Sequence, residues 1–271
     1  MADSLRNEGV GIGPSGGGSD AMKEESPLLE TRGLTKRFDG FLAVDGVNLS
    51  VYPREVRALI GPNGAGKTTF FDLVSGRFPP TSGEIFFKGE DITGLSPDRV
   101  ARQGIGRAFQ ISSLFPSLTA LENVQAAVQV RRSRLNPYQR LSRLNPLWEE
   151  AGSILKEVGL ADKGHLLSSE LSHGDQKLLD IAITLGEDPE LLLLDEPTAG
   201  LSPGETRRTV ETIQSLAARH TLIIVEHDMK VVMTLARKIT VLHQGKVIAE
   251  GPPEEIRRDD RVRQVYLTRG V

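Results

Sequence analysis

The chain has 271 residues, of which 38% are hydrophobic and 25% are charged, a composition typical of a folded globular protein. Its formal net charge of −3, from 33 basic and 36 acidic residues, gives no electrostatic reason to expect a nucleic acid partner. The sequence contains no cysteine, which excludes disulfides and thiolate metal sites. No apolar run approaches the length of a membrane-spanning helix, so we expect that the chain does not cross a membrane by itself.

The first 26 residues are rich in glycine and serine and contain few side chains that could be buried. Such a segment cannot offset the entropy cost of ordering, so we predict a disordered tail over residues 1–26. Asp3, Glu8 and Asp20 and the lack of an apolar stretch argue against a secretory signal. The folded domain is predicted over residues 27–271.

The rest of the chain shows three successive patterns. Short apolar runs separated by Gly, Pro and Asp predict strands, which we expect to form an antiparallel sheet, near residues 28–33, 43–52, 55–60, 84–88 and 105–109. Helical periodicity from Thr119 to Leu185 predicts a helical subdomain at about 115–187. Beyond it, the alternation of strands and helices typical of a parallel sheet is expected at 190–195, 203–219, 221–225, 228–235 and 238–243.

An arginine-rich segment interrupts the helical region. The sequence SRLNP occurs at 133–137 and again at 142–146, with arginines at 131, 132, 134, 140 and 143. Two interpretations stay open: a contact with anionic lipid or an acidic partner, and a solvated surface loop.

A glycine-rich segment, GPNGAGKTT at 61–69, follows an apolar strand and precedes a helical pattern. It fits G-x-x-x-x-G-K-[ST], in which backbone amides surround phosphate oxygens. Lys67 then supplies a charge to the β and γ phosphates, and the Thr68 hydroxyl can bind Mg²⁺. A ligand-free turn is the alternative, which the flanking strand and helix patterns disfavour. We therefore predict ATP and Mg²⁺ as cofactors, with phosphate contacts from Gly61, Pro62, Asn63, Gly64, Ala65, Gly66, Lys67, Thr68 and Thr69.

Four consecutive leucines at 191–194 lead into Asp195 and Glu196. A buried parallel strand presents such carboxylates at its C-terminal edge, although a strand entering a capped turn is the alternative. Together with the phosphate loop, the pattern predicts Asp195 as a Mg²⁺ ligand and Glu196 as the general base that polarises the attacking water.

Between these two motifs, residues 171–176 read LSHGDQ and open a helical pattern. Ser172 is a good N-cap, so a simple helix start is one interpretation. The motif also resembles the LSGGQ signature of ABC ATPases, with His173 and Asp175 departing from the common residues. In that family, the counterparts of the Ser172 hydroxyl and the Gly174 amide contact the γ-phosphate bound to the opposite protomer.

The resemblance covers nearly the whole chain from residue 28. It implies an α/β P-loop NTPase with a RecA-like parallel-sheet core, an N-terminal antiparallel β subdomain and an inserted α-helical subdomain. It also implies a head-to-tail dimer, in which each ATP lies between the Lys67 loop of one protomer and the signature of the other. The signature residues expected to contact nucleotide are Ser172, His173, Gly174 and Asp175.

Further site residues follow from the same resemblance. Phe38 matches the aromatic residue that stacks on adenine, with a core or surface role as the alternative. Gln110 matches the glutamine that reaches Mg²⁺ and water, and His227 matches the histidine that contacts the γ-phosphate. The expected catalytic residues are Lys67, Gln110, Glu196 and His227, and the expected metal ligands are Thr68, Gln110 and Asp195. Ser202 stands where many relatives carry Asp.

Several phrases resemble the ATPases of branched-chain amino acid and urea importers: GRAFQ at 106–110, EHDM at 226–229, the insert near 131–148 and the VYL ending at 265–267. The implied partners are a second ATP-binding subunit, identical or paralogous, membrane permease subunits and, indirectly, an extracytoplasmic solute-binding protein. We expect residues 111–119 to dock a permease helix. The implied location is cytoplasmic, on the inner face of the membrane.

Three other functions are compatible with a phosphate loop of this kind. An ABC ATPase acting on nucleic acid or the ribosome usually has tandem nucleotide domains or a long coiled coil, and neither is present in this sequence. The ATPase of an ABC exporter is a second alternative. A catalytically idle regulatory ATPase is disfavoured because Lys67, Asp195, Glu196 and His227 are all present.

Overall fold

The computed structural model describes residues 26–108, 114–135 and 144–267, and the side chains of 133–135, 144–145 and 266–267 are outside the description. The predicted tail, except Ser26, and the predicted site residue Gln110 therefore lie outside the described residues.

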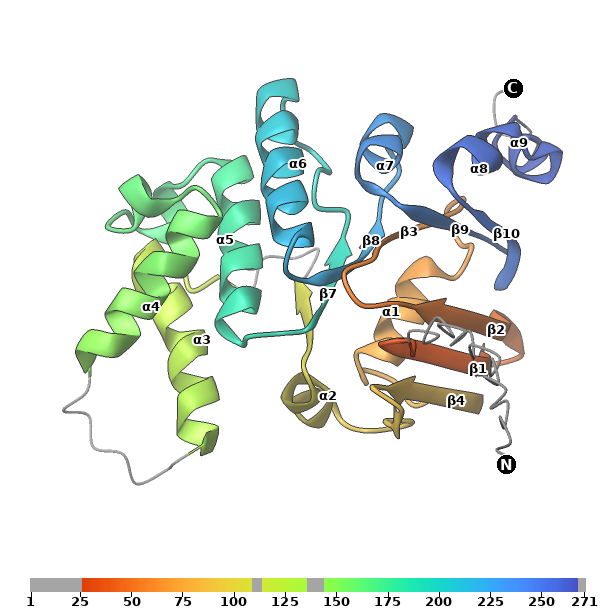
Figure 1. Ribbon diagram of the computed structural model, residues 1–271, viewed down its shortest axis with the longest axis horizontal. Helices are drawn as coiled ribbons and strands as arrows, with labels where there is room; N and C mark the ends of the chain where they lie inside the picture. Colours follow the sequence, from red (N-terminus) through yellow and green to blue (C-terminus); the bar gives the residue numbers. More distant parts are fainter. Residues whose placement is uncertain (1–25, 109–113, 136–143, 268–271) are drawn as a thin grey trace, which may run out of the picture.

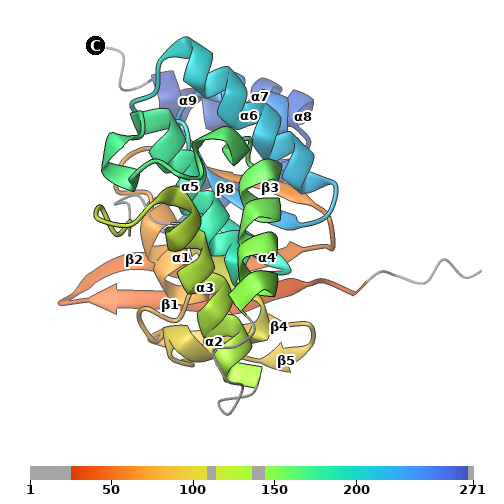
Figure 2. The ribbon, with the colours of Figure 1, turned by 90° about the vertical axis from the view of Figure 1, so that its left-hand side faces the viewer.

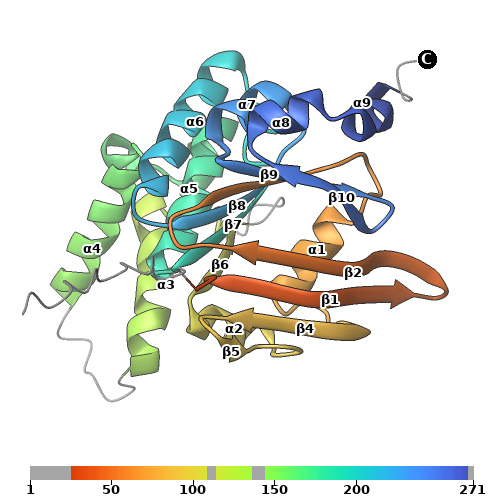
Figure 3. The same cartoon turned by 45° about the vertical axis from the view of Figure 1, so that its right-hand side comes forward.

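The N-terminal part folds into an antiparallel sheet with the strand order β2-β1-β4-β5 (Figure 3). Its strands are β1 (Leu29–Phe38), β2 (Phe41–Val51), β4 (Ser82–Phe87) and β5 (Glu90–Asp91). Buried and exposed residues tend to alternate along β2 and β4, as expected for a sheet with one covered face. The prediction of an antiparallel sheet here is confirmed for these strands.

The second sheet has the order β10-β9-β3-β8-β7-β6, and all its neighbours are parallel except β9 and β10. Its strands are β3 (Val56–Ile60), β6 (Ile105–Ala108), β7 (Leu191–Asp195), β8 (Thr221–Val225), β9 (Lys238–His243) and β10 (Lys246–Gly251). The expectation that the strands at 55–60 and 105–109 join the antiparallel sheet was wrong. Every residue of β3 is buried, because helices or a sheet cover both of its faces.

Helix α1 (Lys67–Val74) lies between the two sheets (Figure 3). One hydrophobic core joins Phe70 and Phe71 of α1 to Leu34 of the antiparallel sheet and to Leu193 and Ile223 of the parallel sheet. Both phenylalanine side chains are fully buried. Burial of an aromatic side chain stabilises the fold by roughly 1.5–3 kcal/mol, so this core holds the start of α1 firmly against β7 and β8.

The other face of the parallel sheet is covered by helices (Figure 1). Helices α5 (His173–Gly186), α6 (Pro203–Ala217) and α7 (Met229–Leu235) lie over this face, and α3 (Ala120–Leu135) and α4 (Leu144–Glu157) pack on α5. Short helices complete the chain: α2 (Pro97–Gln103), α8 (Pro253–Arg258), α9 (Asp260–Leu267) and 3₁₀ turns at Ala161–Lys163 and Ser168–Glu170. In the part of the chain that the structure describes, no helix is long and apolar enough to span a membrane.

Helices α3, α4 and α5 pack together on the side away from the antiparallel sheet (Figures 1 and 2). Val124 and Val128 of α3 and Leu155 of α4 share a core with Leu179 of α5. Of the arginine-rich segment, Arg131 and Arg132 on α3 both pair with Glu150 on α4, which connects the two helices. The side chains of the other three arginines are outside the description.

Candidate nucleotide-binding site

The predicted phosphate loop connects β3 to α1, and two of its glycines are required by close backbone contacts. Gly61 has φ +154° and a Cβ there would lie 2.1 Å from the Leu242 carbonyl oxygen. Gly66 has φ +106°, and a Cβ would lie 2.3 Å from the Ala43 carbonyl oxygen. A side chain at either position would force the loop away from β9 or β2, so only glycine fits.

The loop lines an open cavity of about 310 Å³, within the size range of ligand pockets. Its lining comprises Phe41, Ala43, residues 63–69, Glu196 and His227. The Lys67 ammonium donates hydrogen bonds to the carbonyl oxygens of Gly61 (2.7 Å) and Pro62 (3.2 Å), which holds its charge over the loop. Backbone amides at a helix N-terminus together with a lysine charge are suited to bind a polyphosphate.

Two aromatic residues flank the turn between β1 and β2, and they pair across the hairpin. Phe38, the predicted adenine platform, makes an edge-to-face contact with Phe78 at 5.8 Å, and the Lys36 ammonium lies 5.1 Å from its ring. Phe41, to which sequence analysis gave no role, lines the cavity itself and is 63% exposed. An exposed aromatic ring beside a phosphate loop offers a face on which a base can stack.

Asp195 ends β7, and its side chain is only 3% exposed. Arg107 on β6 donates one hydrogen bond to Asp195 Oδ2 (3.1 Å) and another to Asp72 Oδ1 on α1 (2.6 Å). Burial raises the pKa of Asp195, and the Arg107 guanidinium opposes that shift. The pattern of a buried arginine between two acids was not recognised in the sequence, because its partners are 35 and 88 residues away.

Glu196 and His227 follow the ends of two adjacent strands, β7 and β8, and His227 Nε2 lies 2.7 Å from Glu196 Oε1. Glu196 has φ +50°, a conformation that costs free energy in a non-glycine residue and is often found at functional sites. Buried Glu226 accepts hydrogen bonds from the backbone amides of Thr198 (2.9 Å) and His227 (3.0 Å). Glu226, which sequence analysis gave no role, thus joins the two loops that carry Glu196 and His227.

The residues present fit a magnesium ion that is held mainly by phosphate and water. Mg²⁺ prefers oxygen ligands and keeps several waters, so one or two protein groups suffice. Thr68 lines the loop cavity, and Arg107 engages one of the two carboxylate oxygens of Asp195. Among the described residues, no group of three or more His, Asp or Glu side chains forms a metal-binding cluster of its own.

The predicted signature forms the N-terminus of α5. Ser172 is the N-cap, and its hydroxyl accepts a hydrogen bond from the Asp175 amide (3.2 Å). The Asp175 carboxylate is buried between the Lys163 ammonium (2.5 Å) and the Arg208 guanidinium (2.8 Å). Two cations therefore compensate the negative charge that this departure from LSGGQ introduces.

Two further signature contacts come from the segment after β7. Gly200 packs against the His173 ring, since a Cβ on Gly200 would lie 3.2 Å from His173 Cε1. Glu205 on α6 accepts hydrogen bonds from the Gly174 amide and the Ser172 hydroxyl, both at 3.1 Å. Hydrogen bonds from Ser202 and from Gly174 lower the pKa of Glu205 to about 2.

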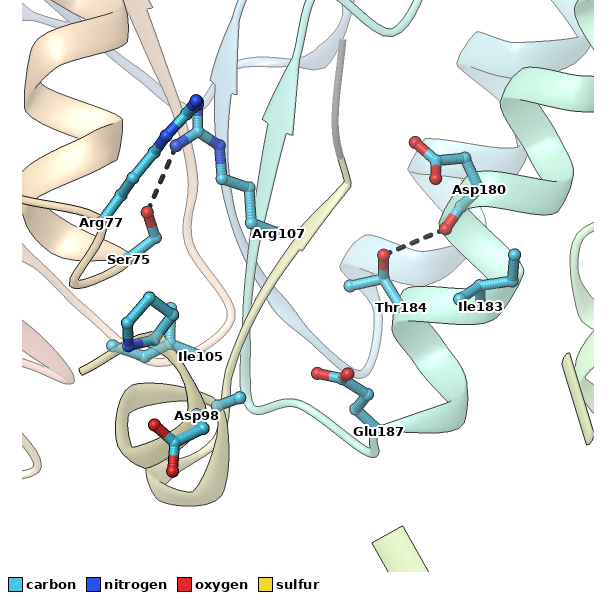
Figure 4. Close-up of a pocket in the computed structure, with 11 residues that line it drawn as sticks. Ser75, Arg77, Asp98, Ile105, Arg107, Asp180, Ile183, Thr184 and Glu187 are labelled. Atoms are coloured by element: carbon cyan, nitrogen blue, oxygen red, sulfur yellow. Dashed lines mark hydrogen bonds between the residues drawn. The ribbon is translucent and has the colours of Figure 1, made fainter. Parts of the chain in front are cut away.

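A second cavity of about 450 Å³ lies between α2 and α5 (Figure 4). Arg107 and Arg77 approach it from one side, and Asp180 and Thr184 of α5 line the other together with Glu187, the residue that follows α5. The same arginine that binds Asp195 therefore reaches the surface of this cavity, where it also donates to Ser75 Oγ (3.2 Å).

Phe115 lies in the segment predicted to dock a permease, and it is 57% exposed.

The sequence and the structure are similar to those of known proteins over most of their lengths. The family described as ABC transporter matches residues 44–199, and one described as branched-chain amino acid ATP-binding cassette transporter matches residues 246–267. LivG of Escherichia coli, a high-affinity branched-chain amino acid transport ATP-binding protein, is 41% identical over 89% of this chain and 98% of its own. BraF of Pseudomonas aeruginosa, of the same description, is 42% identical with the same coverage.

The fold is similar to that of a nucleotide-free ATP-binding cassette from an ABC transporter, with a TM-score of 0.77 and 30% identity over 89% of this chain and 98% of the other. The chain therefore belongs to the ATP-binding subunits of ABC transporters, and it binds and hydrolyses ATP. The predicted fold class is confirmed by the same likeness.

Proposed function

We propose that this chain powers an ABC importer for branched-chain amino acids. The observation that supports this most directly is 41–42% identity with LivG and BraF over almost their whole lengths. The match of residues 246–267 to the branched-chain amino acid cassette family adds a second, C-terminal indication. Urea, the other solute expected from the sequence, stays a prediction and belongs in the same test.

In the proposed mechanism, the loop amides and Lys67 hold the β and γ phosphates, and Thr68 and Asp195 would hold Mg²⁺. The ion, when bound, neutralises charge on the phosphate oxygens. Glu196 accepts the proton of the attacking water, and His227 holds the Glu196 carboxylate at 2.7 Å and contacts the γ-phosphate. Phe38 or Phe41 would stack on adenine, and Gln110, which lies outside the described residues, stays a predicted ligand of the metal and water.

We further propose a head-to-tail dimer in which Ser172 and Gly174 cover the ATP of the opposite subunit. Closure of two subunits would exclude water and complete the charge environment for phosphoryl transfer. The structural relatives include a dimeric cassette bound to ADP and Pi, with a TM-score of 0.72 and 26% identity over 83% of this chain and 98% of that chain. Exposed Phe115 would contact the permease subunits, which would hold the protein on the inner face of the membrane.

The test is reconstitution of the chain with its permease subunits in liposomes that contain ATP. Uptake of labelled leucine that needs ATP and is lost in Glu196→Gln is the expected result. Uptake of urea with no leucine uptake would move the assignment to the second solute. If the chain bound no permease subunit, the proposal of a transport function would be contradicted.

One exporter subunit is also similar to the chain. The lipopolysaccharide export system ATP-binding protein LptB of Haemophilus influenzae is 34% identical over 89% of this chain and 97% of its own. An export role is therefore the second candidate. The higher identity to the amino acid transport proteins and the match at 246–267 favour import.

A further inference from the structure

A carboxylate of the same chain is bound to the signature at the two donor groups assigned to nucleotide. Glu205 Oε1 lies 3.1 Å from the Gly174 amide and 3.1 Å from the Ser172 hydroxyl. The fit is tight, because a Cβ on Gly174 would lie 2.7 Å from that oxygen. The second oxygen, Oε2, accepts from the Ser202 amide (3.0 Å) and hydroxyl (2.7 Å).

Neither donor can serve two anions in the same geometry. The Gly174 amide has one hydrogen, which points to Glu205. The Ser172 hydroxyl also has one hydrogen, and it is shared between Glu205 and Asp175 Oδ2 (3.1 Å). A γ-phosphate oxygen brought to this helix N-terminus would therefore meet a carboxylate of like charge on the same donors.

Asp175, the other acidic side chain at the signature, shares the Ser172 hydroxyl with Glu205 but has cationic partners of its own. The Asp175 carboxylate is neutralised by Lys163 and Arg208. Among the described residues, the groups that donate to the Glu205 carboxylate are neutral: the hydroxyls of Ser172 and Ser202 and the backbone amides of Gly174 and Ser202. Its negative charge is stabilised by the same kind of donors that a phosphate would use at helix N-termini.

We infer that Glu205 is a further residue of the nucleotide-binding machinery: an internal carboxylate that holds the signature donors and that the γ-phosphate must displace. This inference rests on the proposed dimer with a shared site. It assigns Glu205 a positioning role that sets how much ATP is needed for two subunits to close. Because Glu205 also caps α6 with Ser202, it links the loop after β7 to the signature.

The test measures the ATP concentration that half-saturates dimer formation, by light scattering after size exclusion, with Mg²⁺ present. All proteins carry Glu196→Gln so that hydrolysis does not reopen the dimer. Glu205→Gln should lower the required ATP concentration by about five- to tenfold, because charge-assisted hydrogen bonds to the signature become weaker neutral ones. Glu211→Gln, an exposed acid on the same helix, is the matched control and should change nothing.

A second variant and a measurement of the melting temperature separate a role in ATP binding from a purely structural role of Glu205. Glu205→Asp withdraws the carboxylate by one methylene but keeps its charge at α6, so it should also lower the ATP concentration needed for dimer formation. This variant takes the place of Glu205→Gln if Glu205→Gln folds poorly. If both variants only reduce the melting temperature and leave the ATP requirement unchanged or higher, Glu205 is merely a helix cap. If the parent itself never dimerises with ATP, the shared site and this inference are both wrong.

Discussion

His227 Nε2 lies 2.7 Å from Glu196 Oε1, although the two residues are 31 positions apart in the chain. The contact forms because β7 and β8 are adjacent parallel strands, so the loops that follow them lie at the same edge of the sheet. Buried Glu226 fixes their separation through the Thr198 and His227 amides. The arrangement places a carboxylate base and an imidazole together beside the phosphate loop.

Glu196→Gln should reduce ATP hydrolysis by about 10²–10⁴-fold, since an amide cannot take the proton of the attacking water. Nucleotide affinity should stay within a few fold, because Glu196 does not belong to the phosphate loop. Phosphate release and fluorescent-ATP binding measure the two quantities separately. An unchanged rate of hydrolysis would show that another group is the base.

Arg107→Met should destabilise the protein by about 3–5 kcal/mol, because it leaves the buried carboxylates of Asp72 and Asp195 without their shared cation. Denaturant unfolding of the nucleotide-free protein measures this change. Arg102→Met breaks an exposed pair with Asp98 and serves as the control, with an expected loss of about 1 kcal/mol or less. Equal losses in the two variants would contradict a special role for the buried pair.

Removal of the aromatic ring that stacks on adenine should weaken ATP binding by about 1–3 kcal/mol, the usual contribution of aromatic stacking. The structure makes Phe41→Ala the more informative variant, since Phe41 lines the loop cavity and Phe38 packs on Phe78. Affinity for ATP and for inorganic triphosphate should be compared by calorimetry. An equal loss of affinity for both ligands would show that the substituted residue affects the phosphate loop and does not contact adenine.

The stabilising effect of Glu205 should depend on pH. Its pKa in the folded protein is about 2, below the ordinary value of 4.5, so its contribution is present above pH 4.5 and is lost as the pH falls towards 2. The melting temperatures of wild type and Glu205→Gln should thus differ most at neutral pH and converge in acid. A difference that stays constant down to pH 3 would show that the charge of Glu205 has no part in it.

Local sequence alone located the phosphate loop, the acidic strand end and the signature helix, because each depends on a short run of backbone and side chains. The motif spacing identified Gly61 and Gly66, although the carbonyl groups that require glycine there, those of Leu242 and Ala43, are distant in the chain. The α/β class followed equally well from the alternation of patterns after residue 190. These features are encoded by residues close together in the chain.

Only the tertiary structure decided which sheet each early strand joins and which distant groups meet at the site. A short strand such as Val56–Ile60, with the sequence VRALI, has no period that reveals whether one or both of its faces are covered. Arg107 finds Asp72 and Asp195, and Glu205 finds Gly174, only after strands and helices have packed. Polar contacts of this kind depend on three-dimensional distance, which the order of residues does not specify.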